Sequence, residues 1–104
     1  MARSEAIGLI ETFGLVYAIE AADAMCKAAD VELIGFENTA SGYISVLTEG
    51  DVGACRTAVE AGCKAVQEIG SEVYSSVVIA RPHEDLAKIT ALYSLDKLLP
   101  YVEK

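Results

Sequence analysis

An internal repeat limits the folds open to this chain more than any other feature of its sequence. The pattern Thr-x-Gly-x-Val-x-Ala occurs at residues 12–18 and again at 48–54, and Cys-Lys-Ala occurs at 26–28 and again at 63–65. In each copy a strand-like run precedes the first pattern, and a run with helical apolar spacing follows it. Two βαβ halves predict a ferredoxin-like βαββαβ fold of the α/β (α+β) class, with two main helices on one face of a four-stranded antiparallel sheet.

The predicted elements follow one another without a linker. Apolar patterns place strands at about 6–11, 31–37, 43–48 and 73–80 and main helices at about 15–29 and 52–69. Asp51 is expected to cap the second helix at its N-terminus and Gly70 to end it. The small polar turn at 38–42 is expected to join the second and third strands as a hairpin.

The length and the hydrophobic content predict one domain that works as an oligomer. With 104 residues the chain forms a single domain, 1–104, whose core covers about 5–90. The remainder, about 91–104, is expected to form a short C-terminal helical tail, with an amphipathic piece at 95–102. A hydrophobic content of 53% is high for so short a chain, so part of the apolar surface is expected to be buried between subunits.

The charge excludes several classes of partner. The formal net charge is −8, which repels nucleic acid and anionic lipid. Every stretch long enough to cross a bilayer contains charged residues, so no membrane partner is expected. The first residues lack the apolar segment of a signal peptide, which predicts a cytoplasmic location.

Catalytic and metal-binding patterns are scarce. The three cysteines, Cys26, Cys55 and Cys63, fit neither a disulfide framework nor a zinc motif, and we expect them to be reduced packing residues. The one histidine, His83, follows a proline at a strand end and is expected to be a surface or turn residue. We therefore expect no catalytic residue, no metal, no cofactor and no enzymatic activity.

Three further features of the sequence are not explained by packing in a hydrophobic core. They are the turn Ala40-Ser41-Gly42, the lone cation Lys27 on an alanine-rich helix, and the segment 81–83. Each one alone has an ordinary interpretation, as a hairpin loop, a solubilising charge and a strand end.

Together with the motifs around them, these features resemble the hexameric BMC shell proteins of bacterial microcompartments, of the propanediol-, ethanolamine- and choline-utilisation and carboxysome types. The resemblance covers roughly residues 5–90. It is carried by residues 5–15, 18–27, 41–42, 50–54, 58–62 and 81–83, in family order.

The resemblance implies a structural role in a cytoplasmic microcompartment shell. Six chains would form a flat tile in which Ala40, Ser41 and Gly42 line a central pore, and Lys27 and Arg81 would lie at the edge where hexamers meet. The implied partners are other copies of this chain, other shell proteins, the encapsulated enzymes and small metabolites that cross the pore.

The sequence departs from the family at the pore. Asn38 stands where the family commonly has lysine, and Ala40 stands where it has glycine. A ring of neutral hydroxyl and backbone groups is expected, able to pass small polar or anionic molecules and to hinder bulky apolar ones.

Two other interpretations belong to different classes. One is a ferredoxin-like oligomeric regulator that binds a metabolite between subunits. The other is a small ferredoxin-like enzyme, for which only His83 offers a catalytic group.

Overall fold

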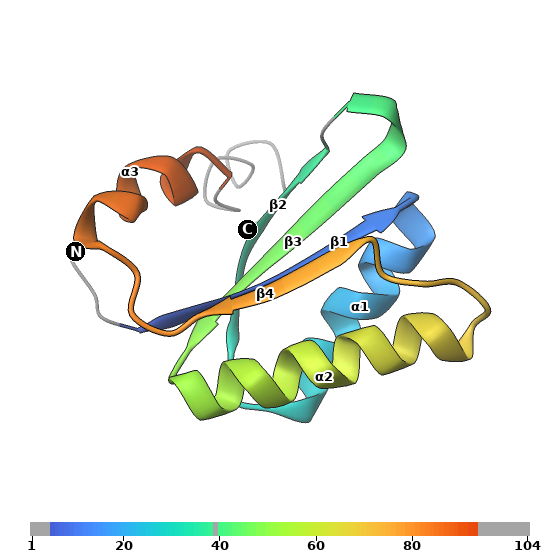
Figure 1. Cartoon of the computed structure of the whole chain (residues 1–104), viewed down its shortest axis with the longest axis horizontal. Helices are drawn as coiled ribbons and strands as arrows, with labels where there is room; N and C mark the ends of the chain where they lie inside the picture. Colours follow the sequence, from blue (N-terminus) through green and yellow to red (C-terminus); the bar gives the residue numbers. More distant parts are fainter. Residues whose placement is uncertain (1–4, 39, 94–104) are drawn as a thin grey trace, which may run out of the picture.

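The structure is a computed structural model and describes residues 5–38 and 40–93. Its strands are β1 (Ala6–Phe13), β2 (Glu32–Asn38), β3 (Tyr43–Gly50) and β4 (Ser75–Ile79), and its helices are α1 (Leu15–Ala28), α2 (Val52–Glu68) and α3 (Ala87–Thr90). Short 3₁₀ segments lie at η1 (Ala40–Gly42), η2 (Glu84–Leu86) and η3 (Ala91–Tyr93). The strands pair antiparallel in the order β2-β3-β1-β4 (Figure 1). This arrangement confirms the predicted ferredoxin-like fold.

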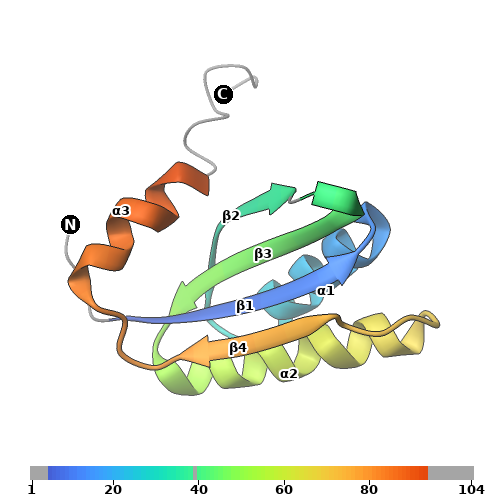
Figure 2. The same cartoon turned by 45° about the horizontal axis from the view of Figure 1, so that its top comes forward.

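The two faces of the sheet have different surroundings. α1 and α2 cover one face, and α3 lies on the opposite side, near one end of the strands (Figure 2). Along β1, Ile10 and Thr12 are fully buried, whereas Leu9 and Glu11 are only half-buried. Because side chains alternate along a strand, Leu9 and Glu11 lie on the face away from α1 and α2, which we call the open face.

Small residues allow the two main helices to pack closely. The buried stripe of α1 consists of three alanines and Met25, as its alanine-rich pattern predicted. On α2, a Cβ added at Gly62 would lie 2.5 Å from Ile10 Cδ1 and 2.8 Å from Met25 Cγ. The helix therefore approaches the sheet and α1 at a distance that only glycine permits.

Both ends of α2 follow the sequence prediction. The Asp51 carboxylate accepts a hydrogen bond from the Ala54 backbone N–H at 2.8 Å. At the other end Gly70 has φ +93°, and the backbone N–H groups of Gly70 and Ser71 donate to the carbonyls of Gln67 and Val66. This is a Schellman motif, which requires a residue in the left-handed region at the position of Gly70.

Some elements differ from their predictions. β4 begins at Ser75 and is therefore shorter than expected. The Tyr74 N–H, just before this strand, still donates to the Glu11 carbonyl at 2.8 Å. β2 carries a register shift between Leu33 and Gly35, and such a bulge explains its incomplete alternation. The expected piece at 95–102 lies outside the described residues.

The predicted apolar stripe of α1 is wrong at its first turn. The spacing predicted that Leu15, followed by Ala18 or Ile19, would face the sheet. Leu15 is 56% exposed, whereas Ala18 is buried and Ile19 is 59% exposed. The buried stripe therefore begins at Ala18 rather than at Leu15.

Candidate functional site

The turn Ala40-Ser41-Gly42 forms η1 at one end of the sheet, between β2 and β3. Ser41 has φ 68° and ψ 23°, the left-handed conformation that non-glycine residues rarely adopt. Gly42 follows with φ +87°, and both residues are exposed. The sharp turn therefore presents the Ser41 hydroxyl to solvent at the tip of the hairpin.

A backbone hydrogen bond fastens this turn to the corner between β1 and α1. The Gly14 N–H donates to the Gly42 carbonyl at 2.9 Å, and the Thr12 hydroxyl donates to the Gly14 carbonyl at 3.1 Å. The Phe13 ring lies against Gly42, where an added Cβ would be 3.3 Å from Phe13 Cε1. The turn thus has a defined position relative to the sheet.

Three aromatic side chains gather beside the turn, a feature that the sequence analysis did not recognise. The Phe13 and Tyr43 rings meet edge to face with centroids 5.1 Å apart, and Tyr43 lies 4.6 Å from the ring of Tyr74. We call these residues the aromatic cluster. The sequence could have indicated this cluster, because each of the three aromatic residues stands at or near the end of a predicted strand. All three of those strand ends lie at the end of the sheet that carries the turn.

A row of polar residues crosses the open face next to the aromatic cluster. The strand register aligns Glu37 with Ser45, Ser45 with Glu11, and Glu11 with Ser75. Directly paired residues share a face of the sheet. The Ser75 hydroxyl donates to Glu11 Oε1 at 3.1 Å. These four residues, the polar row, place two carboxylates and two hydroxyls close to the turn.

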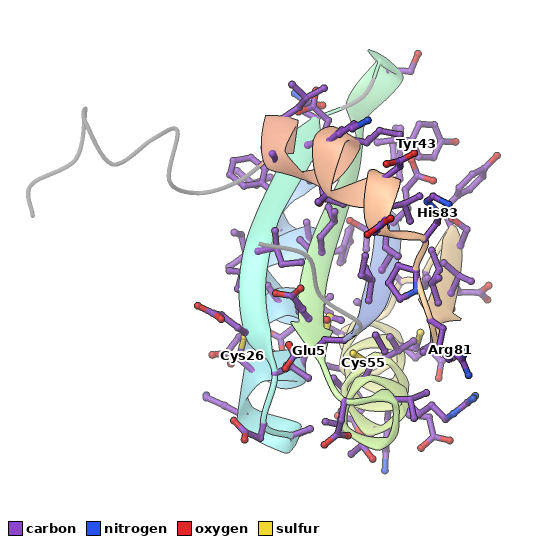
Figure 3. All side chains as sticks on the ribbon, turned by 90° about the vertical axis from the view of Figure 1, so that its left-hand side faces the viewer. Glu5, Cys26, Tyr43, Cys55, Arg81 and His83 are labelled. Carbon is purple, nitrogen blue, oxygen red and sulfur yellow. The ribbon has the colours of Figure 1, made fainter. Side chains whose placement is uncertain are left out.

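The predicted edge residues lie at the other end of the strands. Lys27 is in the last turn of α1, shortly before β2 begins, and Arg81 follows the end of β4. The start of β2 and the end of β4 belong to the same end of the sheet, because Glu32 pairs with Glu49, and Ile7 pairs with both Glu49 and Ile79. In Figure 3, Arg81 and Cys26, the neighbour of Lys27, lie on opposite flanks of this end. The structure thus separates Lys27 and Arg81 from the turn, and from each other.

Both cations at this end are exposed. Lys27 Nζ lies 2.9 Å from the Asp23 carboxylate, one helical turn earlier, and its side chain is 76% exposed. The hydrogen bond to Asp23 and the charge of Asp23 raise the pKa of Lys27, which further favours its charged form. Arg81 is also exposed. Both side chains are therefore accessible to a neighbouring molecule.

His83 has a local structural role. Its Nδ1 accepts a hydrogen bond from the Asp85 backbone N–H at 3.0 Å and so caps η2. The hollow beside it, which Glu5 and Glu49 also line, has a volume of about 50 Å³. That volume holds only a few water molecules. Within residues 5–38 and 40–93, no three His, Cys, Asp or Glu side chains form a metal-binding group.

Cys26 and Cys55 are not activated nucleophiles. Cys55 is fully buried, and its Sγ donates to the Ala6 carbonyl at 3.4 Å. Partial burial, followed by the charge of Asp23, raises the pKa of Cys26, and burial raises that of Cys55, which lowers the thiolate population. Cys63 is half-buried, but Cys26 is exposed, so its predicted packing role is wrong. Cys26 lies at the margin of the buried stripe, one helical turn after Ala22.

The chain is similar to known proteins over most of its length. The sequence profile described as "BMC domain" matches residues 6–82. The bacterial microcompartment shell protein PduA of Citrobacter freundii is 51% identical over 87 residues, which cover 84% of this chain and 92% of that protein. A carboxysome shell protein of Hydrogenovibrio crunogenus is 48% identical and covers 84% of this chain and 85% of its own.

A solved structure has the same fold. The crystal structure of a microcompartment protein from Desulfitobacterium hafniense superposes with a TM-score of 0.74 at 32% sequence identity, over 85% of this chain. The match covers 49% of that protein, so this chain spans about half its length. No helix in the described part of the chain is both long and apolar enough to cross a bilayer.

Proposed function

The chain belongs to the BMC-domain family of bacterial microcompartment shell proteins, and we propose that it forms a hexameric tile whose residues 40–42 line a pore on the six-fold axis. Its role is structural, as it is for the shell proteins that it matches, and it assembles with itself and with other shell proteins. The passage of metabolites through the pore and contact with encapsulated enzymes belong to the proposal.

Exposed apolar residues support the hexamer. The first turns of α1 expose Leu15, Val16 and Ile19, each by more than half of its surface. A patch of large apolar side chains on a small protein indicates a protein–protein contact. Burying it between subunits also accounts for the hydrophobic surplus of the sequence.

The observation that carries the pore assignment is the left-handed Ser41 in an exposed turn held by the Gly14–Gly42 hydrogen bond. A non-glycine residue in this conformation costs about 1 kcal/mol or more. The hydrogen bond between Gly14 and Gly42 holds the turn in place, so the side chain of Ser41 leaves the backbone in a defined direction. Six such turns around an axis would form a ring of small hydroxyl and backbone groups, which selects solutes by size and polarity.

Oligomeric mass and a crystal structure test the proposal. Light scattering at micromolar concentration should give a mass near six chains, and the crystal structure should place Ser41 on the axis. A stable folded monomer would contradict the hexamer, whereas a hexamer with Ser41 far from its axis would contradict the pore assignment alone.

Transport provides the functional test of the pore. Ser41→Leu should slow the consumption of external glycerol by an encapsulated glycerol dehydrogenase about tenfold, because apolar groups replace hydrogen bonds worth roughly 0.5–1.5 kcal/mol each. Ser41→Asn is the matched control, since asparagine has similar bulk, remains polar and tolerates the left-handed conformation. Equal rates for the two variants would show that the polarity of this position does not control passage.

The alternative of a metabolite-binding regulator is less well supported. The relatives that match most of the chain are shell proteins. The hollow on the open face is shallow and does not enclose a metabolite within one subunit, so the tight binding expected of a regulator has no site there.

A further inference from the structure

The end of the open face that adjoins η1 combines aromatic rings with carboxylates, and we propose that it binds small organic cations of the alkylammonium type. This inference extends the proposed pore by naming the class of solute collected at its mouth. Its relevance to transport rests on the proposed function, whereas the binding itself can be tested without it.

The aromatic cluster supplies the first half of the site. Phe13 is 59% exposed and Tyr74 is 65% exposed, although both rings also contact neighbours within the cluster. Aromatic faces attract cations within about 6 Å of the ring centre, and alkylammonium groups suit them because their charge is weakly hydrated. Rings held in contact with one another present such faces without further ordering.

The polar row supplies the second half. A shallow hollow of about 300 Å³ adjoins it, lined by Leu9, Glu11, Ser45, Ser75 and Val77 among others. Leu9 and Val77 provide an apolar floor for alkyl groups, while Glu11 provides a negative charge at the rim. The hydrogen bond from Ser75 fixes the direction of that carboxylate.

The charge of the surrounding chain favours a cation over an anion. Residues 4–26, 28–55 and 65–80 contain no lysine or arginine, and these segments include every strand and the turns at this end of the sheet. Two carboxylates of the polar row, Glu11 and Glu37, are aligned through Ser45. An anion would meet repulsion here, and a neutral solute would gain nothing from the carboxylates.

Tetramethylammonium is the direct probe, and its neutral analogue neopentyl alcohol is the matched control ligand. Saturation-transfer NMR on the intact protein should show magnetisation passing from aromatic protons to the methyl groups of tetramethylammonium, with saturable binding. Affinity should fall as the salt concentration rises, because the carboxylate contribution is screened. Neopentyl alcohol that binds as tightly as tetramethylammonium would overturn the proposal, since the site would then be merely apolar.

Variants locate the site. Phe13→Leu and Tyr74→Leu keep apolar bulk but remove the ring, and each should weaken tetramethylammonium binding about two- to fivefold. Glu11→Gln should weaken it by a similar factor and reduce its salt dependence. Tyr74→Phe keeps the ring and should bind nearly as well as the parent protein.

Phe36→Leu is the control for ring removal elsewhere. Phe36 is partly exposed on β2, paired with Val46 on the face that packs against the helices. Equal loss of binding in Phe36→Leu and Phe13→Leu would overturn the proposed location, as would a complete lack of saturable binding by the parent protein.

Light scattering on every variant separates this proposal from the proposed function. A hexamer that binds no tetramethylammonium overturns only the cation site. Loss of the hexamer in both Phe13→Leu and Tyr74→Leu would assign the aromatic cluster to contacts between copies of the chain and would also overturn the site.

Discussion

At the scale of single residues, the space around a glycine determines how closely the two layers of the molecule approach. Gly62 and Gly53 both belong to α2 but have opposite surroundings. A Cβ at Gly62 would overlap two fully buried side chains, Ile10 and Met25, with the Ala21 carbonyl 3.4 Å away behind them. At Gly53 the nearest atom would be Asp51 Oδ1 at 3.6 Å.

Gly62→Ala is therefore expected to destabilise the protein. Overpacking costs about 1–3 kcal/mol, and contacts as short as 2.5 and 2.8 Å place Gly62 in the upper part of that range, above the gain of about 1 kcal/mol in helix propensity. Gly53→Ala should instead be neutral or stabilising by up to about 1 kcal/mol, since it gains propensity without a clash. Urea midpoints measured at one protein concentration test this pair. A Gly62→Ala variant as stable as Gly53→Ala would show that the helices can move apart freely.

The thiol of Cys55 leads to a prediction at alkaline pH. Burial, followed by the charge of Asp51, raises the pKa of this thiol in the folded protein. The thiol's contribution to the free energy of unfolding is therefore complete below the pKa that the thiol has in the unfolded chain. It is lost as pH rises through the higher pKa that the thiol has in the folded protein. The parent protein should thus lose stability above about pH 8.5 more steeply than Cys55→Ala. Parallel loss in both proteins, measured by urea unfolding across pH, would contradict this assignment.

At the scale of elements, the ends of α2 are specified locally. Asp51 caps its N-terminus through the Ala54 N–H, and the Schellman motif at Gly70 closes its C-terminus. Neither feature depends on a distant part of the chain, so both could be identified from residue type and spacing.

Asp51→Ala should destabilise the protein by about 1 kcal/mol, because an N-terminal backbone donor of α2 loses its partner. Asp51→Asn keeps a side-chain oxygen at the same position and should cost much less. Thermal unfolding of the two variants at matched concentration provides the comparison. Equal losses would indicate that the charge of Asp51, rather than its hydrogen bond, supports the helix.

The order of strands and helices was predictable for the same local reason. The repeat fixes two βαβ halves, and Ile10, Ala18 and Val66 occupy the core positions that their periodicities indicate. Other features arise only when distant segments meet. The aromatic cluster joins residues from β1, β3 and the segment before β4, and Leu15 is exposed although its spacing indicates a core position. Neither feature is encoded in local spacing.

The same distinction applies to the candidate site. The turn was found because Ser41 and Gly42 are small and polar, between two strand patterns. Its left-handed Ser41 and its hydrogen bond to Gly14 were not predictable, since both depend on how β1 and β3 align. The polar row likewise follows from strand register, which the sequence pattern leaves undetermined within a residue or two.

At the scale of the whole molecule, the two proposed functions occupy opposite ends of the same strands. η1 and the aromatic cluster lie at one end, whereas Lys27 and Arg81 lie at the other. The core between them is continuous and tightly packed.

Lys27→Asp is expected to abolish the assembly of sheets while leaving hexamers intact. The exposed ammonium group can extend along a neighbouring tile and donate to backbone carbonyls, and an acid at this position would repel them. Lys64→Asp, an equal charge change on the exposed side of α2, is the control and should assemble. Electron microscopy shows whether sheets form, and light scattering shows whether the hexamer is intact. Normal sheets, or collapse of the hexamer itself, would contradict the role of Lys27.

The placement of these ends has a consequence for how such a protein can diversify. In the proposed tile, substitutions at the hairpin tip would alter which solutes the shell admits, and the perimeter that joins neighbouring tiles would stay the same, because the sheet and helices separate the two. A bacterium could therefore adapt its compartments to a new nutrient by changing a few residues at the hairpin tip. The altered subunits would still assemble with unaltered subunits in the same shell.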